Sequence, residues 1–312
     1  MTAAMCLTGA FFAAPALAAY PEKTISLVVW SGAGGALDVY GRKLSEMLTK
    51  EVGWTNKVEN RPGGSGAVGL SYMRAQPADG YTWVICTGTL SFGIAQGLIP
   101  FKTSDIEFVR AMQGEATSLA VPKNSPFKSV QDFLDALKSG QKLRVGGHSS
   151  GGFHQYMLFQ LTRGLGVRAP WIPHDASGKI PLALLGGHLD AAMMTPSSGY
   201  AQVKSGDIRL LAISSEQRSE VYPDVPTFKE LGFPLSDFIW RGVVVKPGTP
   251  PAVLEAIQGA LNKVEATKEW QDFMVTLDQT NPGYKGEAFR KYVDEQLAEQ
   301  RKFLESEGYI KK

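Results

Sequence analysis

The chain has 312 residues, with 32 Lys and Arg against 30 Asp and Glu, so its formal net charge is +2. Apolar residues make up 44% and charged residues 20%. These values exclude an intrinsically disordered chain, a collagen-like repeat and a small disulfide scaffold. Charge that is nearly balanced, without a block of Lys or Arg, argues against a nucleic-acid-binding or membrane-surface protein. At roughly 100–200 residues for each domain, we expect two domains.

The N-terminal region carries an apolar run at residues 5–14, followed by the small-residue sequence Ala-Leu-Ala at 16–18. This pattern predicts a secretory signal peptide over residues 1–19, and hence an exported, periplasmic protein. No Lys or Arg precedes the run, so a buried N-terminal helix is the alternative. The run is shorter than the ~20 apolar residues that a membrane span needs, and no later segment is long enough. We therefore expect no membrane insertion.

The expected elements alternate between strands and helices along the chain. Short apolar, β-branched runs predict the strands, and 3.6-residue periodicity predicts the helices. The strands are 25–30, 82–86, 143–147, 169–175, 189–194, 209–214 and 239–245, and the helices are 39–52, 68–75, 130–138, 153–163, 180–187, 251–266 and 286–307. This alternation predicts an α/β fold with mainly parallel sheets and helices on both faces.

Small-residue loops follow several of these strands and open the next helix, at residues 31–38, 87–91, 148–152 and 175–179. Ligands of open α/β sheets bind at the carboxyl ends of strands, where backbone N–H groups and helix N-termini attract anions. Each loop by itself is also compatible with an ordinary turn. Four such loops on two sheets predict a carboxylate held from both sides.

One enzyme motif is present at Gly147–Gly151, which matches G-x-S-x-G with Ser149 at its centre. A nucleophile elbow needs an acid and then a histidine further along the chain. The pair Asp175 and His188 has this order, but His188 lies only 39 positions after Ser149, too few for the intervening elements of a hydrolase. A secreted serine hydrolase that uses Ser149 is therefore the weaker alternative, and we assign no catalytic residue.

Cofactor and metal motifs are weak or missing in the sequence. Gly64–Gly69 matches G-x-G-x-x-G, but it follows a polar stretch and lacks the acidic residue about 20 positions further on, so we interpret it as a glycine loop. No zinc or calcium motif occurs, and we predict neither a metal nor a cofactor. Loss of the signal peptide would leave Cys86 as the single cysteine, which excludes an internal disulfide.

Several segments, in order, resemble the periplasmic receptors of the tripartite tricarboxylate transporter family, also called Bug receptors. They are YPEKTISLVVWSGAGGALD (20–38), VENRPGGSGAVG (58–69), ADGYTW (78–83), GGHSSGGFH (146–154), ALLGGHLDAAMM (183–194), GDIRLLAISSEQR (206–218), YPDVPTFKELGFP (222–234) and WRGVVVKPGTPPAV (240–253). The resemblance implies a monomeric, two-lobed periplasmic binding protein of type II, with a ligand cleft between the lobes. It implies lobe 1 at 20–120 plus 241–312 and lobe 2 at 121–240, with crossovers near Val121 and Trp240.

The family resemblance further implies that the protein captures an organic carboxylate and delivers it to membrane permease subunits. A receptor that serves a periplasmic signalling partner is a further alternative. Both terephthalate, an aromatic acid, and citrate, a tricarboxylate, are candidate ligands. The ligand-binding candidates are Trp30, Ser31, Gly34, Gly35, Ala36, Leu37, Thr87, Gly88, Thr89, Ser149, Ser150, Gly151, Gly152, Phe153, His154, His174, Asp175, Ser177, Pro196, Ser197 and Arg241.

Some of these side chains admit two interpretations from the sequence. The bulk of Trp30, Phe92, Phe153 and Trp171 suits either an aromatic ligand or core packing. The imidazoles of His154 and His174 suit either a hydrogen bond to a distal polar group of the ligand or a structural role. The Arg241 guanidinium can pair with a ligand carboxylate, or it can tie the crossover strands together. We expect Asp38, an acidic residue in an anion-binding loop, to be a helix N-cap that satisfies orphan backbone amides instead of touching the ligand.

Overall fold

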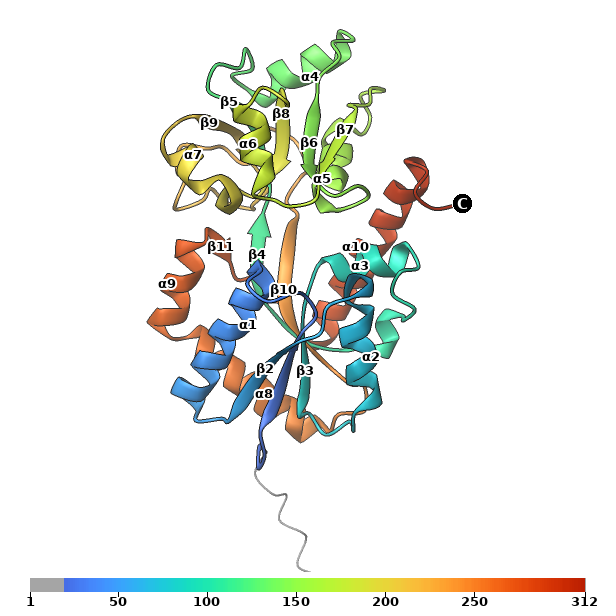
Figure 1. The fold of residues 1–312 in the computed structure, drawn as a ribbon, viewed down its shortest axis with the longest axis vertical. Coiled ribbons are helices and arrows are strands. Elements are labelled where there is room, and N and C mark those ends of the chain that lie inside the picture. The colour runs from blue at the N-terminus through green and yellow to red at the C-terminus, as the bar shows by residue number, and fades with distance from the viewer. Residues whose placement is uncertain (1–19, 312) are drawn as a thin grey trace, which may run out of the picture.

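The computed structural model describes residues 20–311, so the expected signal peptide lies outside the described residues. Two sheets form two lobes, one above the other in Figure 1. The first lobe holds a six-stranded sheet in the order β11-β4-β10-β3-β1-β2. Its strands are β1 (Ile25–Val29), β2 (Asn56–Asn60), β3 (Thr82–Thr87), β4 (Glu107–Ala116), β10 (Phe238–Val245) and β11 (Gln279–Thr280).

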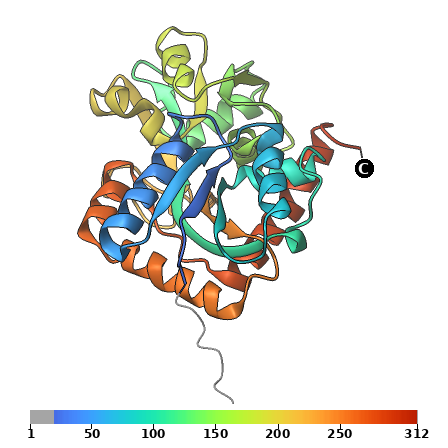
Figure 2. The ribbon, with the colours of Figure 1, turned by 60° about the horizontal axis from the view of Figure 1, so that its bottom comes forward.

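Helices cover both faces of the six-stranded sheet. They are α1 (Ala36–Met47), continued by η1 (Leu48–Val52), then η2 (Gly64–Gly66), α2 (Ala67–Ala75), α3 (Thr89–Ala95), η3 (Thr103–Asp105), α8 (Pro251–Glu265), α9 (Lys268–Thr276) and α10 (Gly286–Ser306). In Figure 2 the blue α1 and the orange α9 lie on one side of the strands, and the cyan α3 and the red α10 lie on the other. The α/β fold expected from the sequence is therefore confirmed.

The second lobe holds a five-stranded sheet in the order β7-β6-β8-β5-β9. Its strands are β5 (Ser118–Pro122), β6 (Val145–His148), β7 (Trp171–His174), β8 (Ala191–Met194) and β9 (Ile208–Ile213). The helices of this lobe are α4 (Val130–Lys138), α5 (Phe153–Thr162), α6 (Lys179–Leu185), η4 (Pro196–Gly199) and α7 (Tyr200–Lys204). The chain enters this sheet between Ala116 and Ser118, and β10 rejoins the first sheet at Phe238.

Both sheets are mixed, so the expectation of mainly parallel sheets was wrong in this detail. Strand β1 is parallel to β2 and β3, but β10 is antiparallel to both β3 and β4. In the second sheet β6 is parallel to β7 and β8, whereas β5 is antiparallel to β8 and β9. The reason is the double crossover: β4 leaves the first lobe and β10 returns to it, so these neighbours run in opposite directions.

Several elements were missing from the sequence-based expectation. Strand β4 carries Arg110, Gln113 and Glu115, and these polar residues hide its strand pattern although all three are buried. Arg110 forms an ion pair with Glu265 on α8, which compensates its burial. Helix α9, between the two expected C-terminal helices, was also missed, as were β2, β5, α3 and β11.

Hydrophobic contacts join the two lobes along one side. Phe92 of α3 and Phe303 and Leu304 of α10 belong to the hydrophobic cluster of the second lobe, together with Tyr156 of α5. The Phe92 and Phe303 rings each meet the Tyr156 ring edge-on, at centroid distances of 5.9 and 5.7 Å. Because α3 and α10 belong to the first lobe, this packing holds α5 against it.

Strand directions decide where the loops lie. Strand β4 continues almost directly into β5, and β3 and β1 run in the same direction as β4. The carboxyl ends of β1 and β3 therefore face the second lobe. Strands β6, β7, β8 and β9 all run opposite to β5, so their carboxyl ends face the first lobe.

Candidate ligand-binding site

The expected ligand loops lie on the two edges where the lobes face each other. In the first lobe these are residues 30–36 after β1 and 87–89 at the end of β3. In the second lobe they are 149–152 after β6, 175–178 after β7 and 195–198 after β8. Strands far apart in the sequence thus bring their small-residue loops to the facing edges of the two lobes (Figure 1), where the sequence predicts the ligand cleft.

The N-terminus of α1 presents free backbone donors at this cleft. Gly35 is the N-cap, and no side chain caps the helix. The N–H groups of Ala36, Leu37 and Asp38 have no preceding helical carbonyl to bind. Gly34, Gly35 and Ala36 are exposed. An anion can therefore approach these amides and the positive end of the helix dipole.

Asp38 supports this loop from beneath, but the expectation that it is the N-cap was wrong, because Gly35 is the N-cap and Asp38 lies in the first turn of α1. Its side chain is only 2% exposed. One carboxylate oxygen accepts from the Gly34 amide and from Arg42 Nε, each at 2.8 Å, and the other accepts from Asn60 Nδ2 at 2.8 Å. Burial alone would raise the pKa of Asp38, but the hydrogen bonds from Arg42, Gly34 and Asn60 outweigh it and lower the pKa to about 2. Asp38 is therefore a charged structural anchor.

The N-terminus of α5 presents a similar set of donors in the second lobe. Gly152 is the N-cap, again without a side-chain cap. Ser149 has a φ of +56°, and a Cβ on Gly152 would lie 2.4 Å from the Ser149 hydroxyl oxygen, so a larger residue at 152 would have to displace that hydroxyl. The Gly151 amide donates to Gln155 Oε1 at 2.8 Å, which leaves the amides of Gly152 and Phe153 as candidate donors.

The histidines of this loop have separate roles. His154 is 2% exposed, and its Nδ1 accepts the His148 amide at 3.1 Å, so the remaining ring proton belongs on Nε2. Burial, with a smaller contribution from His148, lowers the pKa of His154 to about 3, so it stays neutral. The His174 carbonyl accepts the Ser149 amide at 2.9 Å, while His174 Nε2 is buried with no described partner. His154 thus supports the loop through Nδ1, and Nε2 of His154, like Nε2 of His174, is buried with no described partner.

Arg241 is placed by the structure in the crossover. Its guanidinium is 6% exposed and donates to Gln113 Oε1 at 2.9 Å and to Glu115 Oε2 at 2.6 Å. The Glu115 carboxylate also accepts from Ser197 on η4 in the second lobe. Of the two interpretations from the sequence, the structure supports the arginine that ties the crossover strands, because its charge is already paired.

The large aromatic side chains lie in the hydrophobic cores. Trp30, Phe92 and Phe153 are 5%, 4% and 7% exposed and belong to the clusters of the two lobes. Trp171 is half-buried, and its indole nitrogen donates to the Ser149 carbonyl at 2.8 Å. Their rings therefore pack and position the loops, and the bulk that suggested an aromatic ligand has a structural explanation.

A match to a family model covers residues 40–309, and the family is described as the tripartite tricarboxylate transporter family receptor. The chain belongs to this family. BugT of Bordetella pertussis is 30% identical over 86% of each chain. A solute-binding receptor of the same family from Polaromonas, solved without ligand, is 28% identical with a TM-score of 0.83, over 92% of this chain and 99% of that one.

Two further solved structures share the receptor fold at 21% identity. MatC from Rhodopseudomonas palustris was solved with bound malate and has a TM-score of 0.73, over 91% of this chain and 99% of that one. An R. palustris protein solved with adipate has a TM-score of 0.75, over 93% and 98%. The fold expected from the sequence, a two-lobed periplasmic binding protein, is therefore confirmed for this receptor.

The remaining polar groups at the receptor's cleft supply few free charges. The exposed Asp175 carboxylate pairs with Lys179 at 2.8 Å. Ser31 Oγ, at the end of β1, is buried with no described partner. Among residues 20–311 no group of three or more His, Cys, Asp or Glu could hold a metal ion. None of the helices described is both long and apolar enough to cross a membrane.

Several supporting residues were beyond sequence reasoning. Asn60 and Gln155 each bind a ligand loop, and Gln96, the residue after α3, donates to the Gly151 carbonyl at 3.1 Å across the two lobes. Glu115 joins the crossover to Ser197. No motif marks these residues. Asn60, Gln96 and Glu115 act on loops distant in the sequence, and Gln155 binds the Gly151 amide from within the first turn of α5.

Proposed function

We propose that this receptor binds an organic dicarboxylate in the periplasm and delivers it to the membrane subunits of a tripartite transporter. The observation that carries the proposal is the pair of uncapped helix N-termini, on α1 and α5, whose loops lie on facing edges of the two lobes. Each of these termini suits one carboxylate group. The receptors of similar fold solved with malate and adipate support this ligand class.

The charges around the cleft support an anion held mainly by backbone donors. Arg241 is neutralised by Glu115, and Asp38 by Arg42. The donors proposed for the ligand are the amides of the α1 and α5 loops, with Ser31, Ser149, Ser150, Thr89, Ser177 and His174 as polar side chains. Closure of the lobes would remove these donors from water and strengthen each charged hydrogen bond, which contributes roughly 1.5–3 kcal/mol.

Binding by this cleft is proposed without catalysis. No described hydrogen bond joins the Ser149 hydroxyl to a histidine, and the His154 imidazole in the same loop already accepts the His148 amide. A serine nucleophile needs such a base within hydrogen-bond reach. Ester hydrolysis that disappears in Ser149→Ala would contradict this part of the proposal.

A charge-reversal variant tests the ligand class. Ser150 is exposed beside the N-terminus of α5, so Ser150→Asp places a carboxylate where the ligand anion is expected. Gln131→Asp is the matched control, since Gln131 is exposed in the first turn of α4, away from the cleft. A thermal-shift screen with malate, adipate, citrate, terephthalate, sugars and amino acids should show stabilisation of the wild type by a dicarboxylate.

The expected pattern is loss of this stabilisation in Ser150→Asp and its retention in Gln131→Asp. At a ligand concentration 100 times Kd, mass action stabilises the folded protein by about 2.7 kcal/mol. Stabilisation by a sugar or by a cationic amino acid, with none by any carboxylate, would overturn the proposal.

A further inference from the structure

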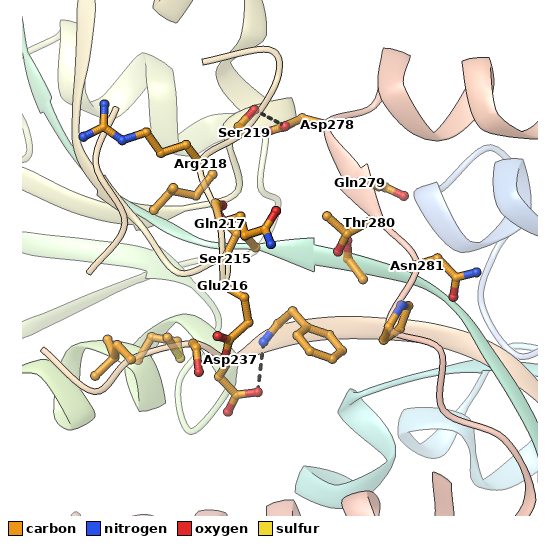
Figure 3. A pocket seen from close by; sticks show the side chains of 18 of the residues that line it. Ser215, Glu216, Gln217, Arg218, Ser219, Asp237, Asp278, Gln279, Thr280 and Asn281 are labelled. Atoms are coloured by element: carbon orange, nitrogen blue, oxygen red, sulfur yellow. Dashed lines mark hydrogen bonds between the residues drawn. The ribbon is translucent and has the colours of Figure 1, made fainter. Parts of the chain in front are cut away.

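A further contact joins the two lobes at the back of the crossover. The Ser219 hydroxyl, in the segment after β9, donates to Asp278 Oδ1, which lies between α9 and β11 (Figure 3). The two residues are 59 positions apart and belong to different lobes. They line a cavity of about 770 Å³ between the lobes, together with the ends of β4 and β10.

The other hydrogen bonds of Ser219 show that its hydroxyl is the donor in this contact. Its hydroxyl oxygen accepts the amides of Val221 and Tyr222, at 3.0 and 3.1 Å. A serine hydroxyl has two acceptor positions and one proton. With both acceptor positions used, the proton is directed to Asp278.

The contact lies on the far side of the crossover from the ligand cleft. In the first sheet, β11 and β1 flank the β4–β10 pair on opposite sides. In the second sheet, β9 and the strands β8, β6 and β7 flank β5 on opposite sides. A rotation about the crossover that brings the β1 and β6 loops together therefore separates the segment after β9 from β11.

Two of the other acidic side chains that line this cavity are already engaged. Asp237 accepts from Tyr292 and Gln296, and Glu216 pairs with Lys229 at 2.6 Å. Glu220 is exposed at the cavity without a described ion pair, and the contact between the lobes is the feature of this cavity that bears on function.

We propose that Ser219 and Asp278 form a latch that holds the ligand-free receptor open and that closure on the ligand must break. This inference rests on the proposed function, since it assumes that a ligand closes the cleft. A receptor whose open state is stabilised binds more weakly, because its apparent affinity falls with the population of the closing-competent state. Loss of the latch therefore raises affinity without any change at the ligand loops.

Titration of Asp278 adds a dependence on pH. Burial raises the pKa of Asp278 from 3.8 to about 6, against the hydrogen bond from Ser219, and Glu115 on β4 raises it further. Tyr222, Arg218 and Glu220 are the other ionisable groups nearby, and Arg218 pairs with Glu230. Because the raised pKa belongs to the latched state, protonation favours the open receptor. Closure on the ligand breaks the contact between Ser219 and Asp278 and returns the pKa of Asp278 towards 3.8. Ligand affinity therefore falls about 10-fold from pH 7.5 to pH 5.

Two variants remove the latch by different routes. Ser219→Ala removes the donor. Asp278→Gly removes the acceptor and suits the backbone, because Asp278 has a φ of +52° that glycine adopts freely. Ser215→Ala is the control, since Ser215 lines the same cavity but donates to the Gln217 carbonyl.

The experiment measures ligand affinity and the distance between the lobes. Val39→Cys on α1 and Leu182→Cys on α6 are exposed labelling positions, and the native Cys86 is fully buried. We expect the stabilising dicarboxylate to bind on the order of 5-fold more tightly to both latch variants than to Ser215→Ala. We also expect the distance between the two labels, measured without ligand, to be shorter in both latch variants than in Ser215→Ala. Asp278→Asn should lose the fall in affinity at pH 5.

The outcomes separate the two proposals. If no carboxylate shortens the distance in the wild type, the proposed function fails. If a carboxylate closes the wild type but both latch variants keep its affinity and its ligand-free distance, the latch is refuted and the receptor function stands. Weaker binding by both variants would also refute the latch, because it would show that the contact supports the closed state.

Discussion

The structure predicts how much the charge of Asp38 contributes to the free energy of unfolding. The substitution Asp38→Asn keeps the shape of the side chain but removes its charge, while the Gly34 amide, Arg42 and Asn60 remain in place. A pKa lowered from 3.8 to about 2 means that the folded state favours the charged carboxylate. At about 1.4 kcal/mol for each pKa unit, this preference amounts to about 2.5 kcal/mol of the free energy of unfolding at pH 7.

The sign of the pH dependence follows from the lowered pKa. The stabilisation by Asp38 is complete above the unfolded-state pKa of 3.8 and disappears as the pH falls through 2. We therefore expect Asp38→Asn to be about 2.5 kcal/mol less stable than the wild type at pH 7, and the difference to shrink between pH 4 and pH 2.

Urea unfolding followed by tryptophan fluorescence measures this difference. Trp171 is the one tryptophan of the second lobe, so the signal reports mainly the first lobe, which contains Asp38. Asp294→Asn is the control, because Asp294 is exposed on α10. A loss at pH 7 no larger than that of Asp294→Asn, or a loss that persists unchanged at pH 2, would refute the reasoning.

Three further predictions concern buried groups. Arg241→Met leaves the Glu115 carboxylate buried without its cation and should cost about 3–5 kcal/mol of unfolding free energy. The double variant Arg241→Met with Glu115→Gln should recover most of this stability, and an equal loss in the single and the double variant would contradict the prediction. Gly242→Ala places a Cβ 2.4 Å from the Arg110 carbonyl oxygen and should destabilise by about 1–3 kcal/mol, measured by thermal unfolding. His154→Phe leaves the His148 amide without its acceptor and should cost about 1–3 kcal/mol; NMR titration of wild-type His154 should show no protonation above pH 5.

The sequence was informative wherever a feature is local. Apolar runs followed by small residues predicted strands that end in helix-opening loops, and α1 and α5 do begin at such loops, at Ala36 and Phe153. Asp38 was expected to bond to backbone amides because an anion loop would not place an acidic side chain on its ligand. It does accept the Gly34 amide, although from the first turn of α1 and not from the N-cap position. These features depend on neighbours within a few residues, so the sequence alone is enough to predict them.

Features that depend on partners distant in the sequence could not be predicted from the sequence. Strand β4 looked too polar for a buried strand, because the partners that make its burial tolerable, Glu265 and Arg241, lie more than 100 positions away. The aromatic side chains of Trp30 and Phe153 gave no sign in the sequence of whether they faced a ligand or a core, and only packing decided it.

The sequence by itself thus determined the α/β class, the family and the small-residue loops, because propensity, turn chemistry and family motifs are properties of short segments. Only the tertiary structure decided that these loops face each other across two lobes, that Arg241 forms an ion pair with Glu115, and that Ser219 and Asp278 meet behind the crossover. The physical reason is that burial and electrostatic pairing depend on which distant residues the chain crossings bring together.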